Sequence, residues 1–325
     1  MQDALVAWFR RHGADYPWRR THDAYAVLVS EMMLQQTRIA TVIERGYFTR
    51  WMEKFPTVGA LAAAAEPEVL RAWEGLGYYA RARNLRKAAQ AVVGKHGGVF
   101  PRKLAELEAL PGIGRYTAGA VASFAFNLPA PLVDGNVARV LARLLDFRDP
   151  VDSAPGKRFL WVEADRLVCT RRPRLWNSAM MELGQRICVP RQPKCGECPV
   201  AKWCRVCGPE AGRLPLLGPR RSMVEVEEHV VWAQGSRGLL LQRESGQRRH
   251  GLWRLPERSA NDTENQPVVL ESRYTITHHR VRLVVHGERA SARAREGEKW
   301  IPLAELPGLP MPAPFRKVVD RLLRV

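Results

Sequence analysis

Long apolar runs are missing from this sequence. No stretch approaches the roughly 20 consecutive apolar residues that cross a bilayer. The N-terminal segment MQDALVAWFR lacks the basic start, the apolar run and the small-residue cleavage site of a secretion signal. We therefore expect no association with a membrane and a cytoplasmic location.

Cysteine is also scarce, and the six cysteines lie between Cys169 and Cys207. In a reducing compartment such crowding indicates a metal site rather than disulfides. The spacing C-x6-C-x2-C-x5-C over residues 188–204 can bring thiolates together around one iron–sulfur centre. Two C-x2-C pairs, which begin at Cys195 and Cys204, leave zinc as an alternative, although the segment between them is short for a zinc ribbon.

Acidic residues are outnumbered, with 33 Asp and Glu against 51 Lys and Arg, and the formal net charge is +18. The basic residues are spread along the whole chain, which favours a polyanionic partner, most commonly nucleic acid. A merely basic soluble protein is the alternative on charge alone. A chain of 325 residues is long for one domain and comfortable for two.

Strand-like alternation is absent from residues 1–205, which predicts an all-α domain. From Asp23 onward, apolar residues recur at helical spacing through Ile39, and Glu31 falls on the same stripe. Further helical runs are expected at about 59–74, 81–95, 102–109, 115–126, 136–146, 156–169 and 174–187.

Glycine and proline interrupt the pattern at residues 206–224, which we interpret as an interdomain linker. Beyond it the apolar period changes to two, which predicts an α+β domain over residues 225–325. The turn Gly235-Ser-Arg-Gly, between valines from Val224 and leucines from Leu239, indicates a β-hairpin. Other expected elements are strands at 267–270, 273–278 and 282–286 and a helix at 313–323.

The stretch 110–136 organises the first domain. It reads LPGIGRYTAGA and, after a short apolar helix, LVDGNVARV. Pro111, Gly112 and Gly114 predict a tight turn between two helices, because glycine tolerates a positive φ. The helix that starts near Arg115 has unpaired N–H groups in its first turn, which suit a phosphate oxygen.

The turn and the segment after it resemble the helix-hairpin-helix of DNA glycosylases. In that superfamily the position of Asp134 holds the catalytic carboxylate. The resemblance also implies that the backbone N–H groups of Ile113 and Gly114 bind a DNA phosphate.

A narrower resemblance is to the MutY family of adenine DNA glycosylases. It rests on SEMMLQQT from Ser30, GLGYYARARN from Gly75, LVDGNVARV from Leu132 and MMELG from Met180. The match is dense over residues 1–205 and loose over 225–325. It implies a multidomain fold: an all-α helix-hairpin-helix glycosylase domain with an iron–sulfur loop, followed by an α+β Nudix-like domain.

The cysteine spacing resembles the iron–sulfur loop of the same branch, which holds a [4Fe-4S] cluster. The ligands implied by this resemblance are Cys188, Cys195, Cys198 and Cys204. Cys169 is expected to be a buried helix thiol, and Cys207 a residue without a role at the cluster.

Two carboxyl groups suit the removal of adenine, a poor leaving group that needs a proton while the sugar becomes cationic. Glu31 lies on an apolar helix face, where burial favours the neutral form of a general acid. Asp134 precedes a helix, where N–H groups favour the ionised form that stabilises the cation or attacks it transiently. The alternatives are a buried Glu31 paired with an arginine and an Asp134 that only caps its helix.

Other roles follow from the resemblance alone. Asn136 would orient Asp134, and Tyr116 would hydrogen-bond the sugar or a carboxyl group. Trp18 and Arg19 would form part of the adenine pocket, although an ordinary structural role is open for every such residue. Gln35 would fill the gap left by a flipped base, with Tyr78 wedged beside the opposite base, whereas Tyr79 is expected in the core.

Tyr116 also separates this chain from the bifunctional endonuclease III relatives. Those proteins carry at this position a lysine that forms a Schiff base with the sugar, which tyrosine cannot do. They also have VDTH where this chain has VDGN. A monofunctional glycosylase is therefore expected.

The C-terminal domain lacks the glutamate-rich box with which Nudix hydrolases bind Mg²⁺, since none follows Pro256. Recognition of 8-oxoguanine without hydrolysis is therefore the expected role. The family uses a Phe-Ser-His loop, and the matching stretch here is Ile276-Thr277-His278. The hydroxyl and the imidazole are present and the aromatic ring is not; an ordinary strand end is the alternative.

The resemblance implies a base-excision-repair enzyme that flips out and hydrolyses adenine opposite 8-oxoguanine or guanine in double-stranded DNA. It would act as a monomer at the nucleoid. The alternatives are an endonuclease III-like glycosylase and lyase for oxidised pyrimidines, and a DNA-binding module without catalysis.

Overall fold

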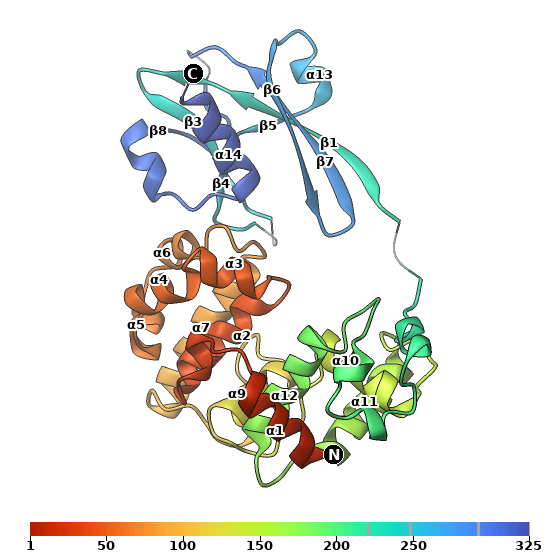
Figure 1. Cartoon of the computed structure of the whole chain (residues 1–325). Coiled ribbons are helices and arrows are strands. Elements are labelled where there is room, and N and C mark those ends of the chain that lie inside the picture. Colours follow the sequence, from red (N-terminus) through yellow and green to blue (C-terminus); the bar gives the residue numbers. More distant parts are fainter. Residues whose placement is uncertain (220–221, 247–248, 291–292, 325) are drawn as a thin grey trace. The chain divides into compact units, whose positions relative to one another are not determined.

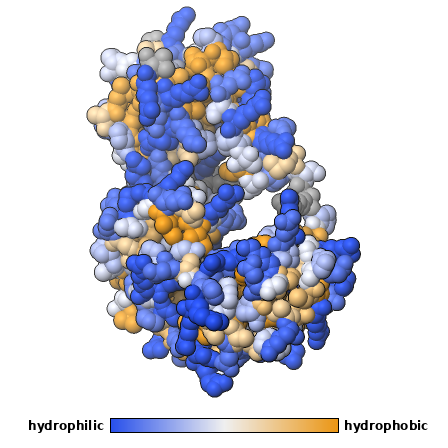
Figure 2. Space-filling view, in the orientation of Figure 1, coloured by the Kyte–Doolittle hydropathy of each residue, from blue (hydrophilic) through white to orange (hydrophobic). Residues whose placement is uncertain are grey.

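The computed structural model describes residues 1–219, 222–246, 249–290 and 293–324. Figure 1 shows the chain, which forms two compact units. Unit 1 contains Met1–Ala62 and Lys87–Pro219, and unit 2 contains Ala63–Arg86 and the C-terminal part from Arg220. Arg220 and Arg221 of the expected linker, and the last residue of the expected C-terminal domain, Val325, lie outside the described residues. Hydrophilic residues dominate the face of each unit that Figure 2 shows.

The helices of the N-terminal two thirds are α1 (Gln2–His12), α2 (Ala24–Leu34), α3 (Ile39–Glu44), α4 (Tyr47–Lys54), α5 (Val58–Ala63), α6 (Glu66–Ala72), α7 (Ala80–His96), α8 (Leu104–Glu108), α9 (Arg115–Phe124), α10 (Gly135–Leu145), α11 (Ala154–Leu167) and α12 (Pro173–Arg186). Short 3-10 turns are η1 (Pro17–Arg19), η2 (Cys195–Glu197), η3 (Ala201–Trp203) and η4 (Pro209–Arg213). Unit 1 contains no strand among the described residues, so the all-α prediction is confirmed. No described helix has the length and apolar content needed to cross a membrane.

Two expected helical runs are broken in the structure. The run 59–74 forms α5 and α6, because Pro67 lies in the first turn of α6, where its missing N–H does no harm. The stripe that begins after Asp23 ends with α2, and Ile39 starts α3. Asp23 caps α2 by accepting hydrogen bonds from the N–H groups of Tyr25 at 3.1 Å and Ala26 at 3.2 Å.

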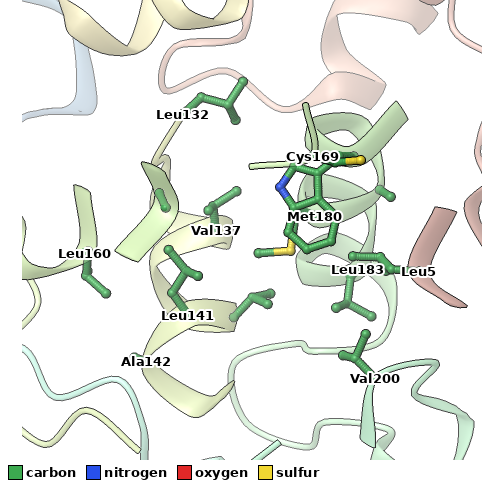
Figure 3. Close-up of a cluster of buried hydrophobic side chains, with 14 of the residues drawn as sticks. Leu5, Leu132, Val137, Leu141, Ala142, Leu160, Cys169, Met180, Leu183 and Val200 are labelled. Atoms are coloured by element: carbon green, nitrogen blue, oxygen red, sulfur yellow. The ribbon is translucent and has the colours of Figure 1, made fainter. Parts of the chain in front are cut away.

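The core of unit 1 joins side chains from α1, α10, α11 and α12, and Figure 3 shows Val137, Leu141, Leu160 and Leu183 in this cluster. Gly184 brings α12 against the start of α10. A Cβ at this position would lie 2.7 Å from the Cβ of Asn136, so glycine is required. Cys169 is buried in the same core, but it lies just beyond the end of α11 and not within a helix as expected.

The segment expected as a linker, 206–224, is shorter in the structure, because residues up to 219 pack against unit 1. Val206, Ala211 and Leu214 are buried together. The Leu214 carbonyl accepts a 2.9 Å hydrogen bond from Nε of Arg143. The Gly218 N–H donates to Asp152 at 2.8 Å. Glycine and proline in this segment therefore mark turns in a packed chain.

Unit 2 contains the strands, as the α+β prediction requires. They are β1 (Val224–Trp232), β2 (Gln234–Gly235), β3 (Gly238–Arg243), β4 (Trp253–Arg254), β5 (Glu257–Arg258), β6 (Val268–Ile276), β7 (His279–Gly287) and β8 (Glu298–Ile301). One sheet has the order β5-β1-β7-β6, and the other joins β2, β4 and β8 to β3. The remaining elements are α13 (Ala260–Thr263), η5 (Leu303–Gly308) and α14 (Ala313–Leu322).

The predicted hairpin is formed only at its tip, where β2 pairs with β3. The valine-rich strand β1 pairs instead with β7, in parallel, over its whole length. The local pattern predicts the turn correctly, but β7, the strand that pairs with β1, is distant from it in the sequence. The two strands expected at 267–270 and 273–278 are the single strand β6.

Residues 63–86 belong to unit 2, although the sequence suggested a first domain that is continuous to residue 205. The hydroxyl of Tyr79 donates to the Met311 carbonyl at 2.9 Å, and Nε of Arg316 bonds to Glu74 at 2.8 Å. Arg71 donates to the Pro307 carbonyl at 2.6 Å. These polar contacts join residues 63–86 to the C-terminal residues of unit 2, and the spacing of residues in the sequence does not predict contacts between segments so far apart.

Candidate active site

A cavity of about 890 Å³ opens in unit 1 between α2, α9, α10 and α12. Most of the residues expected at the site of reaction line it: Trp18, Arg19, Glu31, Gln35, Gly114, Tyr116, Asp134 and Asn136. They come from separate parts of the sequence, and the helical packing of unit 1 brings them together.

Glu31 is buried on α2, with 4% of its surface exposed, and it reaches the cavity. The Tyr116 hydroxyl donates a 2.8 Å hydrogen bond to its Oε2. The pKa of Glu31 is raised from 4.5 to about 7, mainly by burial; the hydrogen bond from Tyr116 opposes this rise, and the charge of Asp134 adds to it. Near neutral pH the Glu31 carboxyl can therefore hold a proton or lose it, as a general acid and base must.

The raised pKa predicts a pH-dependent stability. The folded state binds the Glu31 proton more tightly than the unfolded state, so stability falls as the pH rises from about 4.5 to 7. Glu31→Gln should therefore be more stable than the parent at pH 8, by at most about 3 kcal/mol, and no more stable at pH 4. Thermal unfolding at both pH values measures this difference, with the exposed Glu44→Gln as the control. A Glu31→Gln protein that is less stable at pH 8 would contradict the assignment.

Asp134 is the N-cap of α10. Its Oδ1 accepts a 2.7 Å hydrogen bond from the N–H of Val137, and its Oδ2 accepts one of 3.0 Å from Nδ2 of Asn136. The carboxylate is thus held at the positive end of a helix and faces the same cavity as Glu31. Burial and the charges of Glu31 and Asp134 raise the pKa of Tyr116 well above 10, so Tyr116 is a hydrogen-bond donor and not a base.

The wall of the cavity contains Trp18, whose ring stacks on Tyr16 at 5.3 Å between centroids. Arg19 donates a 2.8 Å hydrogen bond to Glu182, a completely buried carboxylate on α12. Glu182 is a residue that sequence reasoning missed as a candidate. The signal was available, because a glutamate stands among apolar residues in the MMELG segment of an amphipathic helix.

The hairpin between α8 and α9 has the predicted turn. Gly112 has a φ of +72°, which favours glycine, whereas Gly114 has a φ of −91° and open space around it. Gly114 therefore leaves the start of α9 uncovered. The prediction for Ile113 needs correction, because its N–H already donates to the Leu110 carbonyl at 3.1 Å and its side chain is buried. Gln35 also lines the cavity, and its Nε2 donates to Oγ1 of Thr117 on α9 at 3.3 Å.

The four cysteines expected at the cluster are partly buried. The pKa of Cys198 is raised to about 11, mainly by burial and in part by the neighbouring thiols at 188, 195 and 204. Nη1 of Arg143 donates to the sulfur of Cys188 at 3.3 Å. The mutual effect shows that these sulfurs lie close together, and a metal centre would supply the positive charge that holds them as thiolates. Among the described residues, no set of three His, Cys, Asp or Glu side chains surrounds a single-ion site.

Two arginines of α10 connect the carboxylate to the cysteine loop. Arg139 donates 2.9 Å and 2.7 Å hydrogen bonds to Oδ1 of Asn136 and to the Cys188 carbonyl. Arg143, with 1% exposure, donates to the carbonyls of Val189 at 2.8 Å and Pro190 at 2.7 Å. Sequence reasoning missed both arginines. Their spacing of three and seven from Asn136 places them on one polar stripe of α10 and could have found them.

The remaining expected residues lie in unit 2. Tyr78 is 46% exposed, with a φ of +46° that is unusual for a tyrosine. Tyr79 is buried, as expected for a core residue. Thr277 and His278 form the turn between β6 and β7, where Thr277 is exposed with a φ of +54° and His278 is partly buried. The side chains of Tyr78 and Thr277 are thus accessible on the surface of unit 2.

Two family models match this sequence. Residues 29–153 match the HhH-GPD superfamily base excision DNA repair protein. Residues 188–204 match the iron-sulfur binding domain of endonuclease III, which confirms the prediction of an iron–sulfur cofactor.

Similar proteins agree with both models. Human adenine DNA glycosylase is 47% identical over 211 residues, which cover 62% of this chain and only 38% of the human protein. A solved thermostable thymine-DNA glycosylase is 28% identical, with a TM-score of 0.57, over 63% of this chain and 93% of that chain. A non-covalent endonuclease III–DNA complex is 27% identical, with a TM-score of 0.53, over 65% and 94%. Over these regions the chain is thus similar to the HhH-GPD superfamily base excision DNA repair protein, to the iron-sulfur binding domain of endonuclease III and to the adenine DNA glycosylases.

Proposed function

We propose that this protein is a monofunctional DNA glycosylase that removes adenine paired with 8-oxoguanine, or with guanine, from duplex DNA. The observation that carries the proposal is the pair of carboxyl groups in one cavity. Glu31 is buried with a pKa of about 7, and Asp134 is held at the start of α10. A pair with such different environments can divide the acid and the electrostatic roles between its members.

In the proposed reaction, protonated Glu31 donates its proton to N7 of adenine as the bond to the sugar breaks. Asp134 stabilises the cationic sugar, either through space or as a transient nucleophile. The Glu31 carboxylate then accepts a proton from the attacking water. Tyr116 and Asn136 hold the two carboxyl groups in place through the hydrogen bonds that they donate.

A paired adenine reaches such a cavity only after it leaves the helix, which costs a few kcal/mol. We assign Gln35 to the space that the base vacates and Tyr78 to the neighbourhood of the opposite base. Trp18 and Arg19 would form the wall against the flipped adenine. Gly114, at the start of α9, would offer its N–H to a backbone phosphate.

Cys188, Cys195, Cys198 and Cys204 would hold the [4Fe-4S] cluster, which supplies structural support or redox sensing rather than a step of base removal. Arg139 and Arg143 then keep the loop against α10 through the backbone carbonyls that they bind. In this way the cysteine loop supports α10, the helix that Asp134 caps.

Unit 2 would read the base opposite adenine. The proposed domain at 225–325 is Nudix-like, and the turn of Thr277 and His278 would contact 8-oxoguanine. Ile276 stands where the family has an aromatic residue. We therefore expect the preference for 8-oxoguanine over guanine to depend on hydrogen bonds.

The decisive experiment is single-turnover excision on a duplex with one A:8-oxoguanine pair, using cluster-loaded protein. Breaks at the adenine that need alkali would support the proposal. Breaks without alkali would favour a glycosylase with lyase activity, as in the endonuclease III alternative. Tight binding without breaks would favour a binding module and refute the proposed enzyme.

Tyr116→Lys should introduce some strand nicking without alkali. The new amine would lie in the cavity beside both carboxyl groups, from where it can form a Schiff base with the sugar. Borohydride trapping of a covalent DNA adduct measures it, and Tyr116→Phe is the matched control. If neither an adduct nor a nick is observed, Tyr116 does not face the sugar as proposed.

A further inference from the structure

A second cavity of unit 1, of about 430 Å³, is lined by cationic side chains. We call it the arginine cavity, and its polar residues are Arg19, His22, Asn127, Arg171, Arg172 and Arg174. Arg19 and Arg174 also line the candidate active site, so the two cavities are neighbours. No residue of the described lining is an aspartate or a glutamate.

The positive charges of this cavity are only partly balanced. Arg19 is paired with Glu182 at 2.8 Å, and Arg172 is paired with Asp3. Among the residues that the structure describes, no carboxylate lies within ion-pair distance of Arg171 or Arg174. The charges of Arg171 and Arg174 are therefore not paired with a carboxylate of the part of the chain that the structure describes.

Among these arginines, Arg174 has a charge that is costly in free energy to bury. Its side chain is half-buried, and burial lowers its pKa from 12.5. Nη2 donates 2.7 Å hydrogen bonds to the carbonyls of Arg19 and Thr21, and Nη1 contacts the His22 ring. Neutral carbonyls satisfy its N–H groups but do not neutralise its charge.

The position of these arginines at the start of α12 increases the free-energy cost of their charges. Arg172 is the N-cap of α12 and provides no side-chain cap, and the first turn contains no acidic residue. The first turn of a helix carries a partial positive charge, which disfavours cations nearby. The partial positive charge at the start of α12 thus destabilises the charged side chains of Arg171, Arg172 and Arg174, and a bound anion would offset this effect.

We propose that the arginine cavity binds a phosphate group. Guanidinium groups bind phosphate oxygens through paired, charge-assisted hydrogen bonds, and phosphate is the anion that a basic DNA-directed surface meets most often. The group belongs either to the backbone of bound DNA, which rests on the proposed function, or to free phosphate. A simple solvated basic face is the outcome that the test must exclude.

The first test needs neither DNA nor catalysis. Thermal unfolding of the cluster-loaded protein is followed while sodium phosphate replaces sodium chloride at constant ionic strength. A saturable rise in Tm is expected, with an apparent phosphate affinity that is roughly tenfold weaker in Arg171→Ala. Arg171 is exposed, so this variant should fold, and Lys95→Ala, an exposed site on α7, is the matched control.

The second test identifies the source of the phosphate. The salt dependence of DNA binding is compared between the parent, Arg171→Ala and Lys95→Ala, and loss of one phosphate contact lowers the slope by about one. A lower slope in Arg171→Ala alone assigns the cavity to the DNA backbone. A phosphate-dependent Tm that is lost in Arg171→Ala, with an unchanged slope, assigns it to free phosphate. If Arg171→Ala changes neither the phosphate dependence of the Tm nor the slope of the salt dependence, the proposal is overturned, whether or not the protein removes adenine.

Discussion

Replacing Glu31 with glutamine should lower the single-turnover rate of adenine excision by about 100- to 10,000-fold while leaving DNA affinity nearly unchanged. Glutamine has the shape of glutamic acid and can still accept the hydrogen bond from Tyr116, but it has no proton to give to the base. Excision from an A:8-oxoguanine duplex and binding to the same duplex are the two measurements.

The pH dependence of the parent strengthens this prediction. With a Glu31 pKa of about 7 the acid form declines above neutrality, so the rate should fall up to tenfold per pH unit in the alkaline range. The residual rate of Glu31→Gln should not follow this curve. Equal rates for the parent and the variant would assign Glu31 to a structural role, which is the alternative that its position on an apolar helix face left open.

The sequence predicts the local features of this site well. The helix that carries Glu31 and the position of Asp134 before α10 follow from residue type and spacing. Hydrogen bonds between neighbours in the sequence determine these features, and a short window of residues contains all the partners. The turn at Gly112 follows for the same reason, because its positive φ is a local property.

Contacts between distant segments could not be predicted in this way. Glu31 and Tyr116 are 85 residues apart, and Arg19 and Glu182 are 163 apart, so no spacing rule relates them. For Tyr116 a family resemblance suggested the contact, whereas for Glu182 the sequence shows only a glutamate among apolar residues and does not identify Arg19 as its partner. Buried charged pairs of this kind are visible only after the helices have been packed.

The same limit explains the differences at the end of unit 1 and in unit 2. Proline and glycine near Leu214 suggest a free linker, but Arg143 binds the backbone there and apolar side chains cover it. The valines of β1 suggest a hairpin strand, but their hydrogen-bonding partner is β7. Composition predicts the backbone type of each segment, whereas a buried arginine or a distant strand determines where the segment packs.

Asp134→Asn should separate catalysis from helix capping. Asparagine and aspartate cap helices about equally well, and the capped N–H of Val137 keeps an acceptor, so the Tm should change little. The charge that we propose to stabilise the cationic sugar is lost, however, and excision should fall by about 100- to 1,000-fold. The asparagine amide would face Nδ2 of Asn136, so Asp134→Ser, which caps without an amide, is the second variant.

Asp134→Ala completes the comparison. Alanine removes both the cap and the charge, so it should lose about 1 kcal/mol of stability in addition to activity. If Asp134 only caps α10, the excision rate of each variant should change with its stability. Excision should then be normal for Asp134→Asn and Asp134→Ser and reduced for Asp134→Ala. If Asp134 supports the cationic sugar, all three variants should be inactive while only alanine is less stable. The position of one carboxylate at a helix start satisfies both roles in the structure, and this series decides between them because it changes charge and cap independently.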